Sequence, residues 1–540
     1  MTPNARGRGA DGSTRDRLTN GLVALVVAEL AIIAFFPALR GGFVAWDDDT
    51  YFLANPYYRG LGPEQLSWMF TVMSGHYMPL TWLSHGLDYV LWGMRPTGYH
   101  AVNVLLHALT AAAAYFVALR VLAAAVAPEP RAALRVGAAV AALVFALHPL
   151  RVESVAWITE RRDVLCGLFF LLAILCYLRA IEPDGQRRGA WYWSAVALAA
   201  LALLSKAMAV TLPAILVLLD IYPLRRLGPG RWNRREVWLE KIPFVTLSAA
   251  AAVLAIIAQR SVGALSDLRA LGIVDRLGLT CYALVFYAWK TLVPTGLAPL
   301  YEAPYDYTAL RPWFAGSAVV VASAATLALL RRRWPGVAAA GAAFVVLLLP
   351  VLGLVHFGLH IVADRNTYFA GLVPGLVAGG VMLYFLGAPS VATARAAIVA
   401  ALAVVVLLGA LTWRQSRVWH DSRTLWTHAR EVSPSSIAHA KVAVLLEGEG
   451  RTEEAIVHFR EAVRLRPDNA FAQNNWGIAL GNAWRFDEAL DHFEAALRIE
   501  PDYPEARRNL RLTRERITNP VAYLEAQRAY REGLARQSLR

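Results

Sequence analysis

Three adjacent carboxylates, at residues 47–49, directly follow an apolar run that is long enough to cross a membrane. Carboxylates this close repel one another, and such clusters raise pKa values or hold a metal ion. A solvated loop that caps a helix would contain the same residues. The triplet alone therefore leaves both interpretations open.

The segment that contains these carboxylates, residues 40–100, is dense in polar and aromatic side chains. His76, Tyr77, Asp88 and His100 are among them. Sugar-binding clefts use this kind of lining, in which apolar rings alternate with hydrogen-bonding groups. The segment is therefore a candidate binding region for a sugar.

Further charged and polar residues lie at the ends of later apolar runs, where charges are costly unless they pair or serve a ligand. They are His148, Glu153, Arg161, Arg162, Lys206, Asp364, Arg365 and Tyr368. Any single Arg could be a snorkelling side chain or part of a structural ion pair. As a set, they predict one site that combines carboxylates for a proton with cations for an anionic leaving group.

The composition excludes an ordinary soluble enzyme. Of the 540 residues, 57% are hydrophobic and 17% are charged, which indicates many membrane spans. The net charge of +13 could suggest nucleic acid. However, the basic excess lies in the apolar residues 1–413, where cytoplasmic loops collect basic residues. We therefore expect a lipid bilayer as a partner and no nucleic acid.

Eleven apolar runs predict a polytopic, all-α membrane domain with about eleven spans. They lie at about 20–39, 101–127, 136–150, 164–178, 190–204, 207–221, 242–258, 313–330, 335–355, 368–386 and 394–412. Residues 1–19 are expected to be a disordered basic tail in the cytoplasm, so that residues 40–100 form the first outer loop.

A twelfth apolar segment, residues 277–299, decides the side on which the C-terminal tail lies. The basic residues 331–333 fall in the cytoplasm only if this segment does not cross, and Lys290 in its middle suits an in-plane helix. We therefore expect the tail after residue 413 to be extracytoplasmic. If the segment crossed, the tail would lie in the cytoplasm.

The tail contains an internal repeat with a period of 34 residues. The recurring residues are Ala455, Phe459, Ala462 and Pro467, then Ala489, Phe493, Ala496 and Pro501, with a Gly at 477. Small Ala lets two helices approach, Phe fills the groove and Pro stops the second helix. This pattern predicts a tetratricopeptide-repeat (TPR) α-solenoid.

The predicted domains follow from these boundaries. A membrane domain at 20–413 is followed by a connector at 414–434, the repeats at 435–510 and a helical extension at 511–540. Two full repeats are few for an independent solenoid, so the stack is expected to lean on the membrane domain or on a partner.

At these motifs the sequence resembles the transmembrane and TPR glycosyltransferases, the O-mannosyltransferase-like members of the GT-C class, especially bacterial ones. The resemblance runs through residues 43–55, 79–107, 148–165, 205–226, 240–243, 363–368 and the repeats. One departure is Asn366, where the family pattern has Tyr. The change touches none of the proposed catalytic groups.

The resemblance implies a membrane enzyme that takes a hexose, such as mannose, from a polyprenyl-phosphate donor. A carboxylate of the first outer loop would be the general base, with Asp48 preferred and Asp47 second. The donor phosphate would bind Arg161, Arg162, Lys206 and Arg365. The predicted substrate-binding residues are His76, Tyr77, His100, His148, Glu153, Asp364 and Tyr368.

No cofactor is firmly implied. Asp47 and Asp49 could hold a divalent metal, as some members of the class do, whereas the spacing of His148, His356 and His360 does not demand a metal site. The acceptor is expected to be Ser or Thr of an envelope protein, or a glycan, on the outer side of an inner (plasma) membrane, with the repeats as an acceptor module.

Two other function classes remain as alternatives. A non-catalytic membrane scaffold would use the repeats to assemble envelope proteins and would not need the acidic loop. A transporter of lipid-linked sugars would need a polar relay within the membrane, for which the sequence offers only Glu29 and His107.

Overall fold

The computed structural model describes residues 4–73, 75–126, 130–182, 187–262, 272–330, 334–353 and 360–521. The chain forms two compact units. The membrane unit comprises the chain up to residue 299 together with residues 310–422. The repeat unit comprises residues 300–309 and the chain from residue 423 onward.

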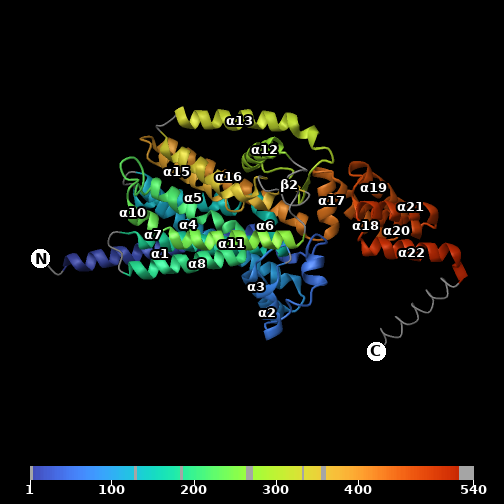
Figure 1. Ribbon diagram of the computed structural model, residues 1–540. Coiled ribbons are helices and arrows are strands. Elements are labelled where there is room, and N and C mark those ends of the chain that lie inside the picture. The colour runs from blue at the N-terminus through green and yellow to red at the C-terminus, as the bar shows by residue number, and fades with distance from the viewer. Residues whose placement is uncertain are drawn as a thin grey trace. The chain divides into compact units, whose positions relative to one another are not determined.

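The described residues are mostly helical (Figure 1). The helices of the membrane unit that contain the apolar runs are α1 (Asn4–Phe35), α4 (Pro96–Ala125), α5 (Arg131–Ala146), α7 (Arg161–Ala180), α8 (Arg188–Ser205), α9 (Leu212–Ile221), α11 (Ile242–Ser261), α12 (Ile273–Leu292), α13 (Arg311–Leu330), α14 (Pro335–Leu348), α15 (Leu372–Leu386) and α16 (Val391–Ser416). Other elements of this unit include α2 (Pro63–Thr71), α3 (Pro79–Trp92), α6 (Val152–Ala156), α10 (Arg235–Leu239) and the strand β2 (His360–Val362).

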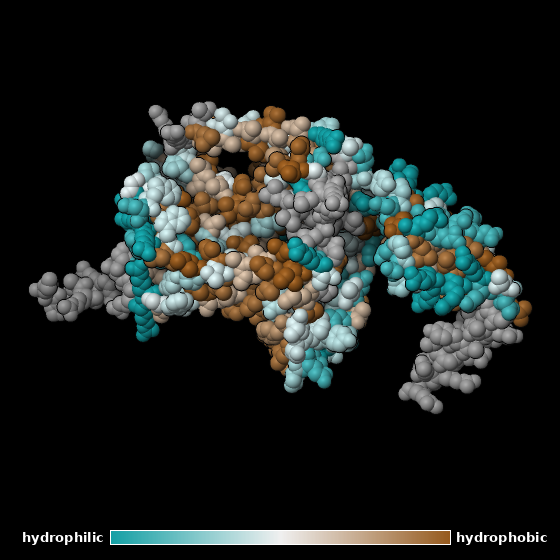
Figure 2. Space-filling model, in the orientation of Figure 1, coloured by the Kyte–Doolittle hydropathy of each residue, from teal (hydrophilic) through white to brown (hydrophobic). Residues whose placement is uncertain are grey.

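Six described helices are long and apolar enough to cross a membrane, and α5 with the bent segment Pro149–Ala156 could form a seventh span. Shorter apolar helices lie at Ala207–Ile221, Pro335–Val351 and Leu372–Leu386. Apolar side chains cover the outside of α11 and α16, as Figure 2 shows. The predicted all-α, multi-pass membrane architecture is confirmed.

The number of crossings stays a prediction. Each of the eleven predicted apolar runs lies largely within a helix. Segment 277–299 is helical up to Leu292 as part of α12, which is not among the six candidate spans of the described residues. The basic residues 331–333, on which the predicted topology depends, lie outside the described residues.

Close helix packing in the membrane unit relies on glycine. A Cβ atom on Gly375 would lie 2.5 Å from the carbonyl oxygen of Ala141, and one on Gly379 would lie 2.5 Å from that of Gly137. Helices α5 and α15 therefore approach along a line of small residues. This is the usual way in which apolar helices gain van der Waals contact within a membrane.

The structure differs from the predicted disordered tail at residues 1–19. Helix α1 begins at Asn4, and its later turns are anchored to α5. Asp16 forms ion pairs with Arg131 and Arg135, and Asn20 accepts a hydrogen bond from Arg135 (2.9 Å). Polar contacts with a neighbouring helix therefore support helical structure before the apolar run begins.

The repeat unit contains paired antiparallel helices and a mostly hydrophilic surface (Figure 2). Its elements are β1 (Tyr301–Glu302), α17 (Ser422–Val432), α18 (Ser436–Gly448), α19 (Thr452–Leu465), α20 (Ala470–Asn482), α21 (Phe486–Ile499) and α22 (Pro504–Thr518). The recurring Ala455, Ala462, Ala489 and Ala496 are all buried. The predicted repeat is confirmed.

The flanking segments of the repeats are also helical. The predicted connector 414–434 contains the end of α16 and the amphipathic α17, which buries Leu425 and Trp426. The predicted extension begins within α22, and residues after 521 lie outside the described residues. Residues 300–309 join the repeats, because Glu302 pairs with Arg466 (2.7 Å) and accepts a hydrogen bond from the Ile437 amide (3.1 Å).

The repeat packing predicts opposite effects for two glycines of α20. A Cβ at Gly477 would lie 2.7 Å from the Phe493 ring, whereas one at Gly481 would meet nothing within 4 Å. Gly477→Ala should destabilise the repeat unit by about 1–3 kcal/mol through overpacking. Gly481→Ala should be neutral or stabilising, because Ala is the better helix former. Thermal unfolding of the purified chain measures both, and equal melting temperatures would contradict this packing.

Candidate active site

The first outer loop is pinned at its start by backbone contacts. A Cβ at Gly41 would lie 3.0 Å from Nε2 of His100, so the chain passes directly against α4. The Gly42 amide donates to the His420 carbonyl (2.8 Å), and the Ala45 amide donates to Oγ of Ser422 (2.8 Å). The acidic triplet is therefore held between α4 and the residues that follow α16.

Asp48 is fully buried, and both of its carboxylate oxygens accept hydrogen bonds. Its carboxylate accepts from the Val44 amide (3.0 Å), from Nε1 of Trp157 (3.0 Å) and from the Thr159 hydroxyl (2.6 Å). Burial raises the pKa of Asp48 to about 7, although the bonds from Thr159 and Val44 act in the opposite direction. Asp48 thus ties the outer loop to the segment before α7.

Asp47 is in a different environment from its neighbour. It is partly exposed, and its carboxylate forms no hydrogen bond with any described residue. Burial raises the pKa of Asp47, and the positive charges of Arg162 and Arg365 partly offset this effect. Asp47 therefore has the free carboxylate oxygens that Asp48 lacks.

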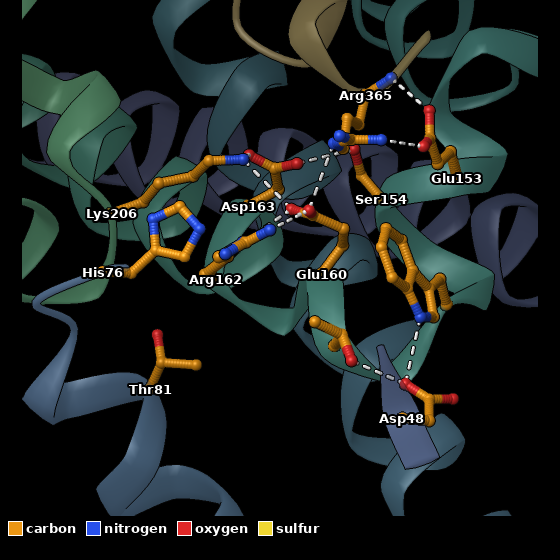
Figure 3. Close-up of polar contacts among 12 residues, drawn as sticks. Asp48, His76, Thr81, Glu153, Ser154, Glu160, Arg162, Asp163, Lys206 and Arg365 are labelled. Carbon is orange, nitrogen blue, oxygen red and sulfur yellow. Dashed lines mark hydrogen bonds and ion pairs between the residues drawn. The ribbon is translucent and has the colours of Figure 1, made fainter. Parts of the chain in front are cut away.

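Three cations converge on one buried carboxylate, Glu160 (Figure 3). Arg162 binds it through two N–H groups, with Nε at 3.0 Å. Nζ of Lys206 lies 3.0 Å from Glu160, and Nε of Arg365 lies 3.3 Å from it. The predicted convergence of Arg162, Lys206 and Arg365 therefore occurs in this structure.

Two further carboxylates complete the cluster. Lys206 pairs with Asp163 (2.7 Å), and the Arg365 amide donates to Glu153 (2.7 Å) while its guanidinium pairs with the same carboxylate. Nη1 of Arg162 is buried and has no hydrogen-bond partner among the described residues. The cluster thus contains an unused donor, which an anionic ligand could satisfy.

His76 and Tyr51 lie beside the same cluster. The His76 ring lies next to Arg162 and Lys206 (Figure 3). Burial, followed by the charge of Arg162, lowers the pKa of His76 to about 3, so the ring is neutral near pH 7. Burial raises the pKa of Tyr51, whose hydroxyl lies in the field of Arg162 and Asp47. Both side chains can therefore form neutral hydrogen bonds to a ligand.

Arg161 belongs to a separate network. It pairs with Asp88 and donates to Asn103 (2.7 Å), to Ser84 (3.1 Å) and to the Tyr99 carbonyl (2.6 Å). The structure does not bring it to the cluster of the other three cations. Its donors instead join the start of α7 to α3 and α4.

Two predicted substrate-binding residues, His148 and Tyr368, form hydrogen bonds within the protein. Nδ1 of His148 accepts from the Leu150 amide (3.2 Å), and its Nε2 donates to the Thr291 carbonyl of α12 (3.0 Å). The Tyr368 hydroxyl bonds to Nδ1 of His107 (2.9 Å) within the helix core. These contacts connect helices and leave no ring nitrogen of His148 for a ligand.

The remaining predicted residues differ in exposure. The Tyr77 hydroxyl is exposed and donates to the Phe70 carbonyl (3.3 Å). His100 is buried beneath Gly41, and Asp364 is buried at the start of the turn that carries Arg365. Among these residues, Tyr77 is the one that can meet a ligand from solvent.

Glu160 is the main site residue to which the sequence assigns no role. It opens the charged motif that continues with Arg161 and Arg162, and its position there is the signal that could have identified it. The described residues contain no group of three or more His, Cys, Asp or Glu that could hold a metal ion. Oδ1 of Asp49 accepts from the Thr50 amide (2.9 Å).

Comparison with known sequences finds one short family match and several long relatives. Residues 470–503 match the tetratricopeptide repeat family. The chain is 26% identical to human Protein O-mannosyl-transferase TMTC1, over 88% of this chain and 59% of that protein. It is 25% identical to Drosophila melanogaster Protein O-mannosyl-transferase Tmtc3, over 75% of this chain and 50% of that protein. The chain thus spans only about three fifths or less of these relatives.

Two solved structures are also similar to the chain. ArnT from Cupriavidus metallidurans, bound to undecaprenyl phosphate, is 14% identical with a TM-score of 0.37, covering 78% of this chain and 80% of that one. The Archaeoglobus fulgidus oligosaccharyltransferase in its apo form is 13% identical with a TM-score of 0.40, covering 74% and 56%. The sequence relatives confirm the resemblance to the transmembrane and TPR O-mannosyltransferases.

Burial of Asp48 predicts a pH-dependent contribution to stability. Its pKa of about 7 in the folded chain exceeds the ordinary value of 3.8. The folded chain therefore binds the proton more tightly, and the free energy of unfolding falls as the pH rises from about 4 to 7, by about 1.4 kcal/mol per pKa unit. Below and above that window this contribution is constant.

Thermal unfolding in detergent at several pH values tests this contribution. The stability of the wild type relative to Asp48→Asn should fall between about pH 4 and 7 and then level off. Asp502→Asn, which replaces a fully exposed carboxylate, is the control and should leave the shape of the curve unchanged. A pH-independent difference between wild type and Asp48→Asn would contradict the burial argument.

Proposed function

We propose that the chain is a membrane glycosyltransferase that moves a hexose from a polyprenyl-phosphate donor to a hydroxyl group of an acceptor. The observation that carries the proposal is the position of Asp47. This carboxylate has free oxygens and lies in the field of Arg162 and Arg365. A base near converged cations suits a reaction in which an acceptor hydroxyl loses its proton while an anionic phosphate departs.

The proposed reaction is a single displacement with inversion. The acceptor oxygen attacks the anomeric carbon while Asp47 takes its proton, and a new C–O bond forms. The bond between that carbon and the phosphate oxygen breaks, and its electron pair leaves with the phosphate. Arg162, Lys206 and Arg365 stabilise the developing negative charge.

Asp47 is preferred to Asp48 as the base. Both oxygens of Asp48 already accept hydrogen bonds from the chain, from Val44, Trp157 and Thr159. Asp48 is also fully buried, so an acceptor hydroxyl could reach it only if the enclosing side chains moved and left buried donors unpaired. We therefore assign Asp48 a positioning role, in which it fixes the loop that presents Asp47.

The resemblance supports the proposed donor and sugar. The relatives that match most of this chain are O-mannosyl-transferases by name. Mannose on a polyprenyl phosphate is therefore the donor to test first. Such a donor keeps its lipid chain among the apolar helices and brings its phosphate to their ends.

The proposed acceptor is Ser or Thr of an extended protein segment, held by the repeat unit. Side chains of Val444, Phe471 and Leu512 are exposed there, on α18, α20 and α22. Nδ2 of Asn509 donates to Asn474 across two of these helices (3.0 Å). Exposed apolar side chains on these helices can pack against the side chains of an extended peptide. A glycan acceptor remains the alternative.

Replacement of Asp47 is the main test of this function. Asp47→Asn keeps the size of the side chain but removes the proton acceptor, so kcat/KM for sugar transfer should fall roughly 100-fold or more. In the wild type, the acid limb of the pH profile should lie above the ordinary Asp value, because burial raises the pKa of Asp47. Transfer of radiolabelled mannose from a polyprenyl phosphate to envelope proteins measures both.

Asp49→Asn is the matched control for this test. Asp49 belongs to the same triplet, but its contact is a local hydrogen bond from Thr50, so transfer should stay within about threefold of wild type. Full activity of Asp47→Asn would contradict the assignment of Asp47 as the general base. A chain that needs its repeats but neither Asp47 nor Asp48 in cells would instead be a non-catalytic scaffold.

Labelling of introduced cysteines tests the proposed orientation in the membrane. Asp502→Cys lies at a fully exposed position of the repeat unit, and Asn233→Cys lies in the exposed loop before α10. With the repeats on the outer side, a membrane-impermeant maleimide should label the cysteine at 502 without permeabilisation of the membrane and the cysteine at 233 only after it. The reverse pattern would place the repeats in the cytoplasm.

A further inference from the structure

We propose that Glu160 is a positioning residue that presets Arg162, Lys206 and Arg365 for the phosphate of a lipid-linked donor. This inference rests on the function proposed above. Glu160 is fully buried, and it is the one described side chain that contacts all three cations. It would not touch the reacting atoms itself.

The three cations depend on Glu160 to different extents. Lys206 has a second carboxylate partner in Asp163 (2.7 Å), and Arg365 has one in Glu153. The hydrogen bonds of the Arg162 guanidinium to described residues all go to Glu160. Removal of Glu160 therefore leaves the Arg162 guanidinium without a hydrogen-bond partner among the described residues. Lys206 and Arg365 would each keep a carboxylate.

The geometry of the guanidinium explains why this matters for a ligand. Arg162 uses its Nε and Nη2 edge for Glu160, and because the group is planar, Nη1 points away from that carboxylate. Nη1 is buried and has no partner among the described residues. A buried N–H without an acceptor is costly, so an anionic oxygen that reaches it binds favourably.

The charge of Glu160 also allows three like charges to stay close together. Without it, Arg162, Lys206 and Arg365 would repel one another in a site that is largely removed from water. With it, their positions are fixed before a ligand arrives, so that little reorganisation is needed when phosphate charge develops. Glu160 thus orients the three cations before the anion binds.

Binding of undecaprenyl phosphate provides a test that does not need activity. The purified full-length chain should show a saturable rise in melting temperature with this lipid, and Glu160→Gln should need about tenfold more lipid for half of the effect. Arg162→Lys should behave similarly, because Lys cannot keep a two-point contact. Glu182→Gln, in an exposed pair with Arg120, is the matched control and should bind as wild type does.

Kinetics then separate positioning from a merely structural role. With a polyprenyl-phosphate mannose donor, Glu160→Gln should raise the donor KM about tenfold while changing kcat much less. Glu160→Asp, which keeps the charge but reaches less far, should be intermediate, and it serves as the test variant if the Gln variant does not fold. Unchanged lipid binding and KM in a folded variant would overturn the inference.

The remaining outcomes distinguish this inference from the proposed function. Lipid binding that depends on Glu160, in a chain that transfers no sugar, supports the inference and counts against the glycosyltransferase function. Sugar transfer that is unchanged by replacement of Glu160 supports the glycosyltransferase function and counts against the inference. An equal rise in melting temperature with inorganic phosphate, or none with undecaprenyl phosphate, would overturn the assignment to a lipid-linked phosphate.

Discussion

The guanidinium of Arg161, which lies buried at the start of α7, holds together the elements that carry the site. Its partner Asp88 lies on α3, within the first outer loop, and its partner Asn103 lies on α4. One side chain therefore joins the first outer loop to α4 and α7. Asn103 in turn donates to the Trp157 carbonyl (3.2 Å) and thereby fixes the segment that continues to Glu160. Loss of a partner would leave a buried charge unpaired, which typically costs about 3–5 kcal/mol.

Many of the buried charges in the membrane unit belong to two compensated groups. One group surrounds Glu160, and another surrounds Asp220, which pairs with Arg226 (2.9 Å) and Lys241 (2.7 Å) and accepts from the Tyr177 hydroxyl (2.7 Å). Charges in an apolar environment persist only when paired and hydrogen-bonded, so each group must form as a whole. The group at Glu160 differs in keeping one unused donor, on Arg162.

Sequence patterns predicted much of the fold but less of the site. Apolar runs and the 34-residue repeat depend on local periodicity, and helices form at these positions. The charged motif before α7 was harder to interpret. Arg161 and Arg162 are neighbours in the chain, yet successive residues of a helix point about 100° apart. One therefore turns toward Asp88 and the other toward Glu160.

The sequence by itself determined which segments are apolar, where the repeats lie and that carboxylates and cations gather at the ends of the apolar runs. These properties depend only on the order of residue types along the chain. Only the tertiary structure decided which of two adjacent carboxylates is free. Asp48 is enclosed by Trp157 and Thr159, whereas Asp47 is not. Those donors lie more than a hundred residues away, and burial and hydrogen bonding depend on distance in space.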